Sequence, residues 1–182
     1  MKKFKLLALG ITLAAAVITA NTLAEPAPVA ATVTSAEIST LATVAAIDKD
    51  EILLGTVALH KHASHEIDQF ANMMIGQHGA NLTEILQLAN QLHALPLSSV
   101  MADQFIADGN KDLVALGGLQ GVSFEKAYVN AMVTGHEGAL HLIDTQLMQT
   151  ATTPEIKKFM IATRAAVAMH LEHAKKLQQA EK

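Results

Sequence analysis

The chain is 182 residues long, contains no cysteine and carries a formal charge of −4. This length allows one domain of ordinary size. The lack of cysteine excludes disulfides, cysteine zinc sites, iron–sulfur clusters and thiol nucleophiles. The negative charge argues against nucleic-acid binding, and the 3% aromatic content is poor for an all-β sandwich or an outer-membrane barrel. The composition therefore favours a helical protein.

Residues 1–24 have the pattern of a secretory signal peptide. Three lysines lie among the first five residues, residues 6–20 carry no charge, and small residues precede Ala24. The apolar run of about 15 residues is shorter than the ~20 needed to span a bilayer. We expect cleavage after Ala24 and export to the periplasm, with an uncleaved membrane anchor as the alternative. Cleavage would remove three of the 13 basic residues and no acidic one, leaving a charge of about −7 and no transmembrane segment.

The chain after the leader begins with an extended tether and a helical hairpin. Residues 25–34 contain two prolines and small residues, which is typical of a tether. The residues from Thr34 to Glu37 match a capping box, so we expect a first helix over 35–61. After a polar break, apolar residues at three- and four-residue spacing predict a second helix over 65–92.

A second hairpin follows a long connection. The connection, residues 94–121, contains a weak amphipathic segment near 99–116 that predicts a short helix. Ser123 is placed to cap a third helix over 124–149. Thr153 and Pro154 are typical of a helix start, and the fourth helix runs to about residue 177.

Four long amphipathic helices predict an all-α protein, a four-helix bundle over residues 35–180. Each helix of about 26 residues spans ~40 Å, and a bundle buries all four apolar stripes. The connection of about 28 residues is longer than a bundle loop needs. It allows a ferritin-like crossover, in which the second and third helices run parallel, and simple up-down connectivity stays open.

Each predicted stripe carries one ionisable residue among apolar ones: Glu51, His78, His136 and His170. A buried ionisable group is costly unless it is paired or ligated. Glu51 and His78 lie about 20 Å from the predicted first turn, and His136 and His170 about 25 Å from the second. Either connectivity lets the four side chains approach one level of the bundle.

Three imidazoles and one carboxylate suit a single transition-metal ion: zinc, copper, nickel, iron or manganese. A di-iron site of the ferritin type needs more carboxylates and Glu-x-x-His pairs, which this chain lacks. His173, one turn from His170, is an alternative ligand or a partner of one. Tyr128, two turns from His136, is too far along the helix for direct ligation and is assigned a supporting role. A metal-free layer of hydrogen-bonded His and Glu explains the same pattern.

No nucleophile, P-loop, dinucleotide or His-Glu-x-x-His motif is present, and no organic cofactor is indicated. Binding is therefore expected rather than catalysis. Three functions stay open: storage, buffering or sensing of a metal; a metal-free structural or stress-related interaction protein; and a small metalloenzyme. The sequence identifies no partner and leaves a homo-oligomer open.

Three segments carry a family resemblance: residues 70–78 (FANMMIGQH), residues 121–128 (GVSFEKAY) with His136, and residues 169–174 (MHLEHA). Over about residues 38–177 the chain resembles a large bacterial family of domains of unknown function. Its members are often labelled "predicted outer membrane protein", carry signal peptides and are similar to ferritin-like four-helix bundles. The resemblance implies that the family's recurrent polar positions are Glu51, His78, Tyr128, His136 and His170.

The chain departs from the family pattern at two positions. The family often has Asp before the histidine of the second helix, where this chain has Gln77, and Phe-Asp after the glycine-rich segment, where this chain has Phe124 and Glu125. The first departure puts a supporting carboxylate beside His78 in doubt. Because the family's activity is not established, the resemblance implies fold and location more than function.

Overall fold

A computed structural model describes residues 32–180 of the chain. The predicted leader, the greater part of the predicted tether and the last two residues lie outside the described residues. Within them the structure contains helices and no strands, which confirms the all-α prediction. The elements are α1 (Ser35–His60), α2 (His65–Gln91), α3 (Val100–Gly117), α4 (Gly121–Leu142), the π-helical turn η1 (Ile143–Leu147), α5 (Met148–Thr150) and α6 (Pro154–Ala180).

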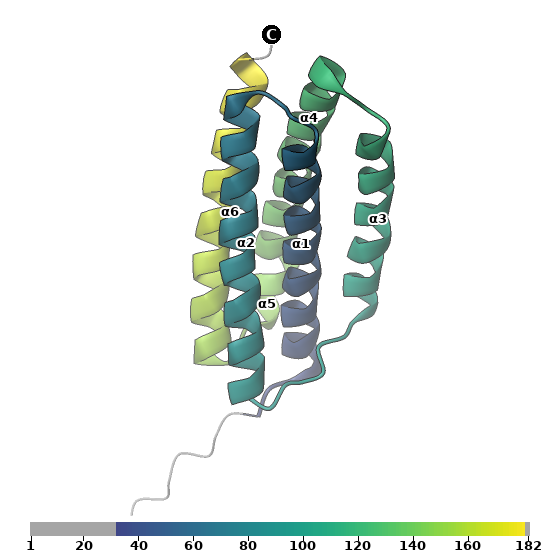
Figure 1. The fold of residues 1–182 in the computed structure, drawn as a ribbon. Helices are drawn as coiled ribbons and strands as arrows, with labels where there is room; N and C mark the ends of the chain where they lie inside the picture. The colour runs from purple at the N-terminus through teal and green to yellow at the C-terminus, as the bar shows by residue number, and fades with distance from the viewer. Residues whose placement is uncertain (1–31, 181–182) are drawn as a thin grey trace, which may run out of the picture. The chain divides into compact units, whose positions relative to one another are not determined.

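The four long helices α1, α2, α4 and α6 form the bundle, and α3 lies outside it against α1 (Figure 1). At one end, Lys61 after α1 donates hydrogen bonds to the carbonyls of Gly117 and Leu119. Towards the other end, Thr43 and Ser99, at the start of α3, are in hydrogen-bond contact. Helix α3 therefore runs parallel to α1 and returns the chain to the end where α2 began. Helices α2 and α4 are parallel, as in the crossover connectivity that the sequence left open.

The predicted start of the third long helix was wrong. Helix α4 begins at Gly121, with Gln120 at the N-cap, so Ser123 lies inside the helix and does not cap it. Gly121 has φ +54°, a left-handed conformation that glycine adopts without strain, so the helix starts directly after the turn. At the other end the helical segment continues to Thr150, close to the predicted end at residue 149, but it is not regular. The α-helix gives way at Ile143 to a π-helical turn, in which Ile143 and Leu147 are both buried. Such a turn inserts an extra residue, which 3.6-residue periodicity does not predict.

The apolar core has two parts with a polar layer between them. One part lies around Phe70, Met74, Phe124 and Tyr128 in the half of the bundle that contains the first turn. The other lies around residues of the opposite half, including Leu41, Ile85, Ile143, Ile156 and Met160. The buried residues that fall between the two clusters are polar: Asp48, Glu51, His78, His136, Thr163 and His170.

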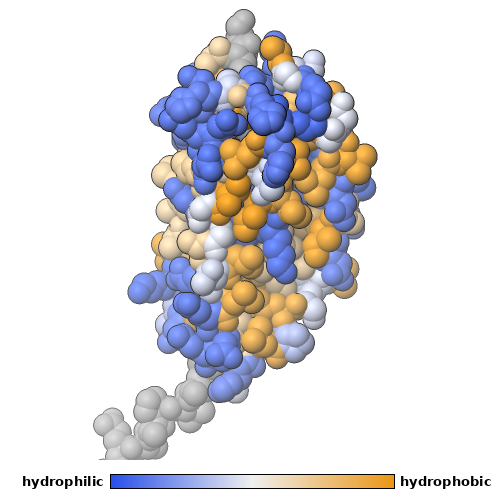
Figure 2. All heavy atoms as spheres, viewed as in Figure 1, coloured by the Kyte–Doolittle hydropathy of each residue, from blue (hydrophilic) through white to orange (hydrophobic). Residues whose placement is uncertain are grey.

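Helix α3 covers α1 and leaves an apolar groove open towards α2. Figure 2 shows apolar side chains gathered along the middle of this face, with polar side chains towards both ends. A groove of about 570 Å³ is lined by residues of α1, α2, α3 and the connection before α3, among them Ala42, Ala46, Leu82, Leu86, Pro96 and Ile106. No helix among residues 32–180 is long and apolar enough to cross a membrane.

Glu37 ties the start of α1 to the turn before α6. Its side chain is fully buried and completes the predicted capping box with Thr34. The second carboxylate oxygen accepts hydrogen bonds from the backbone N–H groups of Thr152 and Thr153, at 2.9 and 2.6 Å. Burial alone would raise the pKa of Glu37, but the hydrogen bonds from Thr34, Thr153 and Thr152 outweigh it and lower the pKa from 4.5 to about 2.

This arrangement predicts an acid-sensitive contribution to stability. A carboxylate whose pKa is lowered by folding stabilises the protein above its unfolded pKa, near 4.5, and the contribution is lost as pH falls towards 2. Glu37→Gln should lower the free energy of unfolding at pH 7 by about 2–3 kcal/mol, and should flatten its pH dependence between pH 4.5 and 2. Denaturant titrations across this range measure both effects. The exposed Glu84→Gln serves as the control, and an equal change in both variants would contradict the prediction.

Gly55 allows close approach of α1 and α2. A Cβ at Gly55 would lie 3.0 Å from Ile75 Cγ1 and 3.1 Å from the carbonyl oxygen of Ala71, whereas a Cβ at Gly79 meets nothing within 4 Å. Gly55→Ala should therefore lower the free energy of unfolding by about 1–2 kcal/mol through crowding. Gly79→Ala should raise it by about 0.5–1 kcal/mol through helix propensity. Chemical denaturation distinguishes the two, and a stabilised Gly55→Ala variant would show that the helices can separate at little cost.

Candidate metal centre

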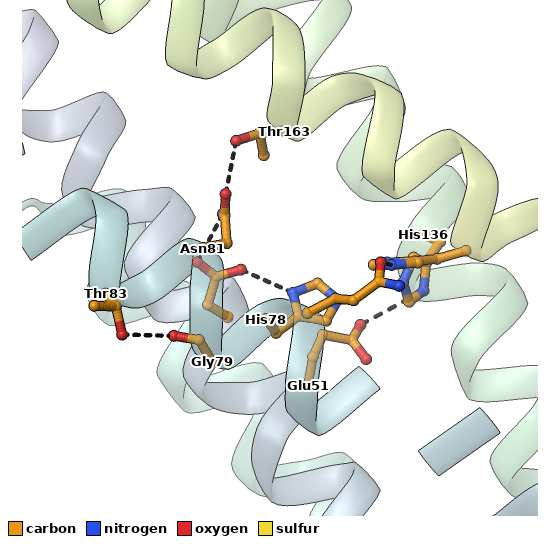
Figure 3. A network of polar contacts seen from close by, with 10 residues as sticks. Glu51, His78, Gly79, Asn81, Thr83, His136 and Thr163 are labelled. Atoms are coloured by element: carbon orange, nitrogen blue, oxygen red, sulfur yellow. Dashed lines mark hydrogen bonds and ion pairs between the residues drawn. The ribbon is translucent and has the colours of Figure 1, made fainter. Parts of the chain in front are cut away.

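Each predicted ligand lies on the inner side of its own helix. Glu51 lies on α1, His78 on α2, His136 on α4 and His170 on α6, and their side chains are between 1% and 6% exposed. The same helical stripes that bury the apolar residues above and below them also bury these four side chains. The crossover connectivity places them in the polar layer between the two apolar clusters. Figure 3 shows Glu51, His78 and His136 in this layer.

The three histidines are in mutual contact. One ring nitrogen from each of His78, His136 and His170 lies within 4.8 Å of the others. The ring centroids are 5.9 Å apart for His78 and His136, 5.0 Å for His78 and His170, and 5.5 Å for His136 and His170. Ligand bonds from imidazole to zinc are about 2.0–2.1 Å long, so nitrogens that share an ion lie a little over 3 Å apart. Small side-chain adjustments would bring this cluster to that spacing.

Hydrogen bonds at the outer edge of the cluster determine which ring nitrogen carries the proton. His78 Nδ1 is 2.8 Å from Asp48 Oδ1, His136 Nδ1 is 2.8 Å from the Met132 carbonyl, and His170 Nε2 is 2.7 Å from Gln77 Oε1. All three partners are oxygens that accept, so each imidazole donates outward. In a neutral ring the other nitrogen is then an unprotonated lone pair, which is the form that binds a metal.

These remaining nitrogens are buried and have no hydrogen-bond partner. They are Nε2 of His78, Nε2 of His136 and Nδ1 of His170, and Glu51 Oε2 is in the same condition. Four acceptor atoms thus lie in one layer without a donor. A buried polar atom without a partner costs free energy, and a cation bound between acceptors would remove that cost.

The electrostatic environment keeps His170 neutral. Burial lowers the pKa of its imidazole, and the charges that His78, His136 and His173 would carry lower it further, to about 3 from an ordinary value of 6.5. Burial raises the pKa of Asp48, and the hydrogen bond from His78 partly offsets that effect. At neutral pH the His170 ring therefore offers a lone pair rather than a positive charge.

Glu51 lies beside the histidine cluster rather than within it. Its Oε1 atom is 3.6 Å from His136 Nδ1, and the carboxylate does not belong to the group of mutually close ligand atoms formed by the histidines. Figure 3 shows the Glu51 side chain pointing towards His136. The structure thus brings three of the four predicted ligands together and places the fourth as an adjacent carboxylate with one free oxygen.

His173 and Tyr128 do not reach the cluster as ligands. His173 is half-buried and packs edge-on against the ring of Phe70, with ring centroids 5.2 Å apart. Tyr128 is fully buried and stacks on Phe124. Its hydroxyl has no hydrogen-bond partner among the described residues. Burial and the charge of Glu51 raise the pKa of Tyr128 well above its usual value, so the phenol stays protonated.

The sequence did not predict the residues that hold the histidines. Asp48 is 1% exposed and receives hydrogen bonds from His78 and from Asn81 Nδ2, the latter at 2.9 Å. Asn81 in turn accepts a hydrogen bond from Thr163 at 3.1 Å (Figure 3). Gln77, in place of the Asp that the family often has, had put a supporting carboxylate beside His78 in doubt, and Asp48 supplies that carboxylate from α1 instead. The signal for it was present, because Asp48 lies one helical turn before Glu51.

A small cavity adjoins the cluster between α2 and α6. Its volume is about 20 Å³, enough for one water molecule or one ion. It is lined by Asp48, Gln77, His78, Asn81, Thr163, Ala166, Val167 and His170. The lining therefore joins two of the histidines to the hydrogen-bonded chain that holds them.

A family model described as "Domain of unknown function (DUF4142)" matches residues 22–177. The chain belongs to the DUF4142 family. This confirms the resemblance to an uncharacterised family over nearly the same range. No curated protein and no solved structure matches the chain. Membership of DUF4142 therefore assigns no activity, and the function has to be argued from the site itself.

Proposed function

We propose that the protein binds one divalent transition-metal ion in the bundle, with His78, His136 and His170 as ligands. The observation that carries this proposal is a cluster of three histidines with one ring nitrogen each within 4.8 Å of the others, in which every ring also has one buried nitrogen without a partner. Outward hydrogen bonds orient each ring, as partners of metal-bound histidines commonly do. Glu51 provides negative charge beside the ion and a free oxygen as a fourth ligand.

Zinc or copper is the expected occupant. Three imidazoles with an optional carboxylate form a site typical of Zn²⁺, and imidazole also suits Cu²⁺. Both ions bind nitrogen ligands more tightly than Fe²⁺ or Mn²⁺ in the general order of stability. A mononuclear site with one neighbouring carboxylate gives no basis for di-iron chemistry. Storage, buffering or sensing of the ion is the proposed role, and we assign no reaction.

The leader-like pattern of residues 1–24 supports the further proposal that this binding takes place after export, in the periplasm. A site without cysteine fits that setting, because imidazole and carboxylate ligands are not consumed by oxidation to disulfides. Fusion of residues 1–34 to a reporter that is active only outside the cytoplasm tests export directly. A reporter that stays inactive and cytoplasmic would contradict it.

The competing proposal is a metal-free structural or stress-related interaction protein, in which the buried residues form only a hydrogen-bonded polar layer. The chain of hydrogen bonds from Thr163 through Asn81 and Asp48 to His78 favours it, since such networks can specify how helices pack. A satisfied layer would pair its acceptors with donors, however, and the inner nitrogens and Glu51 Oε2 have none. This imbalance of acceptors over donors favours the metal.

Metal analysis of protein purified without a histidine tag tests the proposal. After exposure to zinc, copper, iron and manganese in turn, followed by desalting, we expect about one zinc or copper ion per chain. Isothermal titration of the metal-free protein should give the same stoichiometry. Retention of none of the four metals would refute the proposal and leave the metal-free layer.

A further inference from the structure

The histidine cluster lies deep in the bundle, so an ion has to cross a wall of side chains to reach it. Along the bundle axis the way is closed on one side by Phe70, Met74 and Met132, and on the other by Ile85 and Met160, all of which are buried. Any route must therefore pass sideways, between neighbouring helices.

The face between α3 and α4 has a groove at the level of the cluster. The groove has a volume of about 340 Å³ and is lined by Asp112, Asn130, Ala131, Thr134 and Gly135. Its side chains are small or polar, and the lining includes no basic residue. Asp112 on α3 is exposed, and the neighbouring Lys111 is bound to Asp108 at 2.6 Å.

Gly135 brings the groove close to the buried carboxylate of Glu51. A Cβ at Gly135 would lie 3.7 Å from Glu51 Oε1, and apart from the adjacent residues and backbone of its own helix no other atom lies within 4 Å of that position. The same oxygen is 3.6 Å from His136 Nδ1, while Glu51 Oε2 is buried without a partner. The absence of a side chain at Gly135 therefore leaves a short path from the groove to Glu51, whose carboxylate lies beside the His136 ring on the side of its proton-bearing nitrogen.

Negative charge follows this path from the surface inward. Asp112 lines the groove, and the half-buried Asp50 on α1 is close enough to both Glu51 and Asp112 that their charges act on it. Asp50 also packs so closely on α3 that a Cβ at Gly109 would collide with its carboxylate. A row of carboxylates attracts cations and repels anions, and a groove lined by charges of one sign focuses their field.

We propose that this groove over Gly135 is the access route by which a divalent cation reaches the histidine cluster, with Asp112 at its mouth and Glu51 at its inner end. Glu51 then has two roles. During loading its carboxylate would bind the ion as the ion loses its bound water, and after loading it would remain beside the three imidazoles as the fourth ligand. This inference rests on the proposed metal binding. It differs from that proposal because it concerns the rate of loading, whereas the ligands set the affinity at equilibrium.

The cavity between α2 and α6 is the alternative route. It adjoins His78 and His170, and Ala166 lies in its lining. Its volume of about 20 Å³ is far smaller than the 340 Å³ of the groove over Gly135. The only carboxylate in its lining is Asp48, which is buried, so no exposed carboxylate attracts a cation to it. A larger side chain at Ala166 would close this opening without touching the groove.

The test is the rate at which the metal-free, full-length protein takes up Zn²⁺ from solution, followed by stopped flow with a zinc-sensitive dye as competitor. Gly135→Leu should slow loading about tenfold or more while the dissociation constant stays within about threefold of wild type. Gly138→Leu is the matched control, because Gly138 is also an exposed glycine of α4 and has open space around it. It should load at the wild-type rate.

Asp112→Asn tests the route without adding bulk. Asp112 is exposed, so the substitution leaves folding intact. It should slow loading about two- to fivefold at low ionic strength, and the effect should fade at high salt because the attraction is screened. Wild-type loading rates in both Gly135→Leu and Asp112→Asn, or slow loading in Ala166→Leu alone, would overturn the route while leaving metal binding intact. Lack of zinc binding by wild type at equilibrium would instead refute the proposed function.

Discussion

Replacement of His136 by alanine should remove most of the thermal stabilisation that zinc gives to the wild-type protein. A ligand that binds the folded state at about 1,000 times its dissociation constant adds roughly 4 kcal/mol to the free energy of unfolding. For a chain of this size that corresponds to a rise in Tm of roughly 8–16 °C. His136→Ala removes one of three imidazoles from a site whose ligands come from three helices, so at the same zinc concentration less than about a quarter of the shift should remain.

His173→Ala is the matched control for this measurement. His173 is on the same helix as His170 but packs against Phe70 outside the three-histidine cluster. Its variant should keep the full zinc-dependent shift, whereas His78→Ala and His170→Ala should lose it as His136→Ala does. Scanning calorimetry with and without zinc gives each value. A full shift in His136→Ala would remove it from the ligand set, and loss of the shift in His173→Ala would restore that residue as a ligand.

The fold and the approach of the histidines were accessible from the sequence because they depend on helical periodicity. Apolar residues at three- and four-residue spacing define each inner stripe, and one ionisable residue interrupts each stripe. The ends of the helices were equally readable where side chains form the caps. Thr34 and Glu37 form the predicted capping box, and Pro154 begins α6.

What the sequence could not give depends on contacts between distant segments. Asp48 lies one helical turn before Glu51 in the sequence, but its role depends on contacts that cross from α1 to His78 and Asn81 on α2. The π-helical turn at Ile143 breaks the periodicity on which the prediction relied. The path of α3 along α1 depends on tertiary contacts such as those of Lys61, so two connectivities were equally consistent with the stripes.

Replacement of Asp48 by asparagine should weaken zinc binding about 10- to 100-fold without unfolding the protein. Asp48 accepts a hydrogen bond from the Nδ1–H of His78, which fixes the orientation of the ring and leaves Nε2 unprotonated. The negative charge of Asp48 also makes Nε2 a stronger electron-pair donor to a metal. Asparagine has nearly the same shape but carries no charge, and its single oxygen can accept from His78 or from Asn81 but not from both, so the variant loses the charge and one of the two hydrogen bonds. Isothermal titration with zinc measures the change in affinity.

The loss should act through His78 and through no other ligand. In the His78→Ala background, Asp48→Asn should therefore have almost no further effect on affinity, since its partner ring is gone. The exposed Asp108→Asn gives the control for a change of one negative charge. Independent, additive effects of the two substitutions would show that Asp48 contributes only general electrostatic attraction. A coupled pair would show instead that Asp48 on α1 sets the affinity of a ligand on α2, which makes the packing of these two helices part of the metal site.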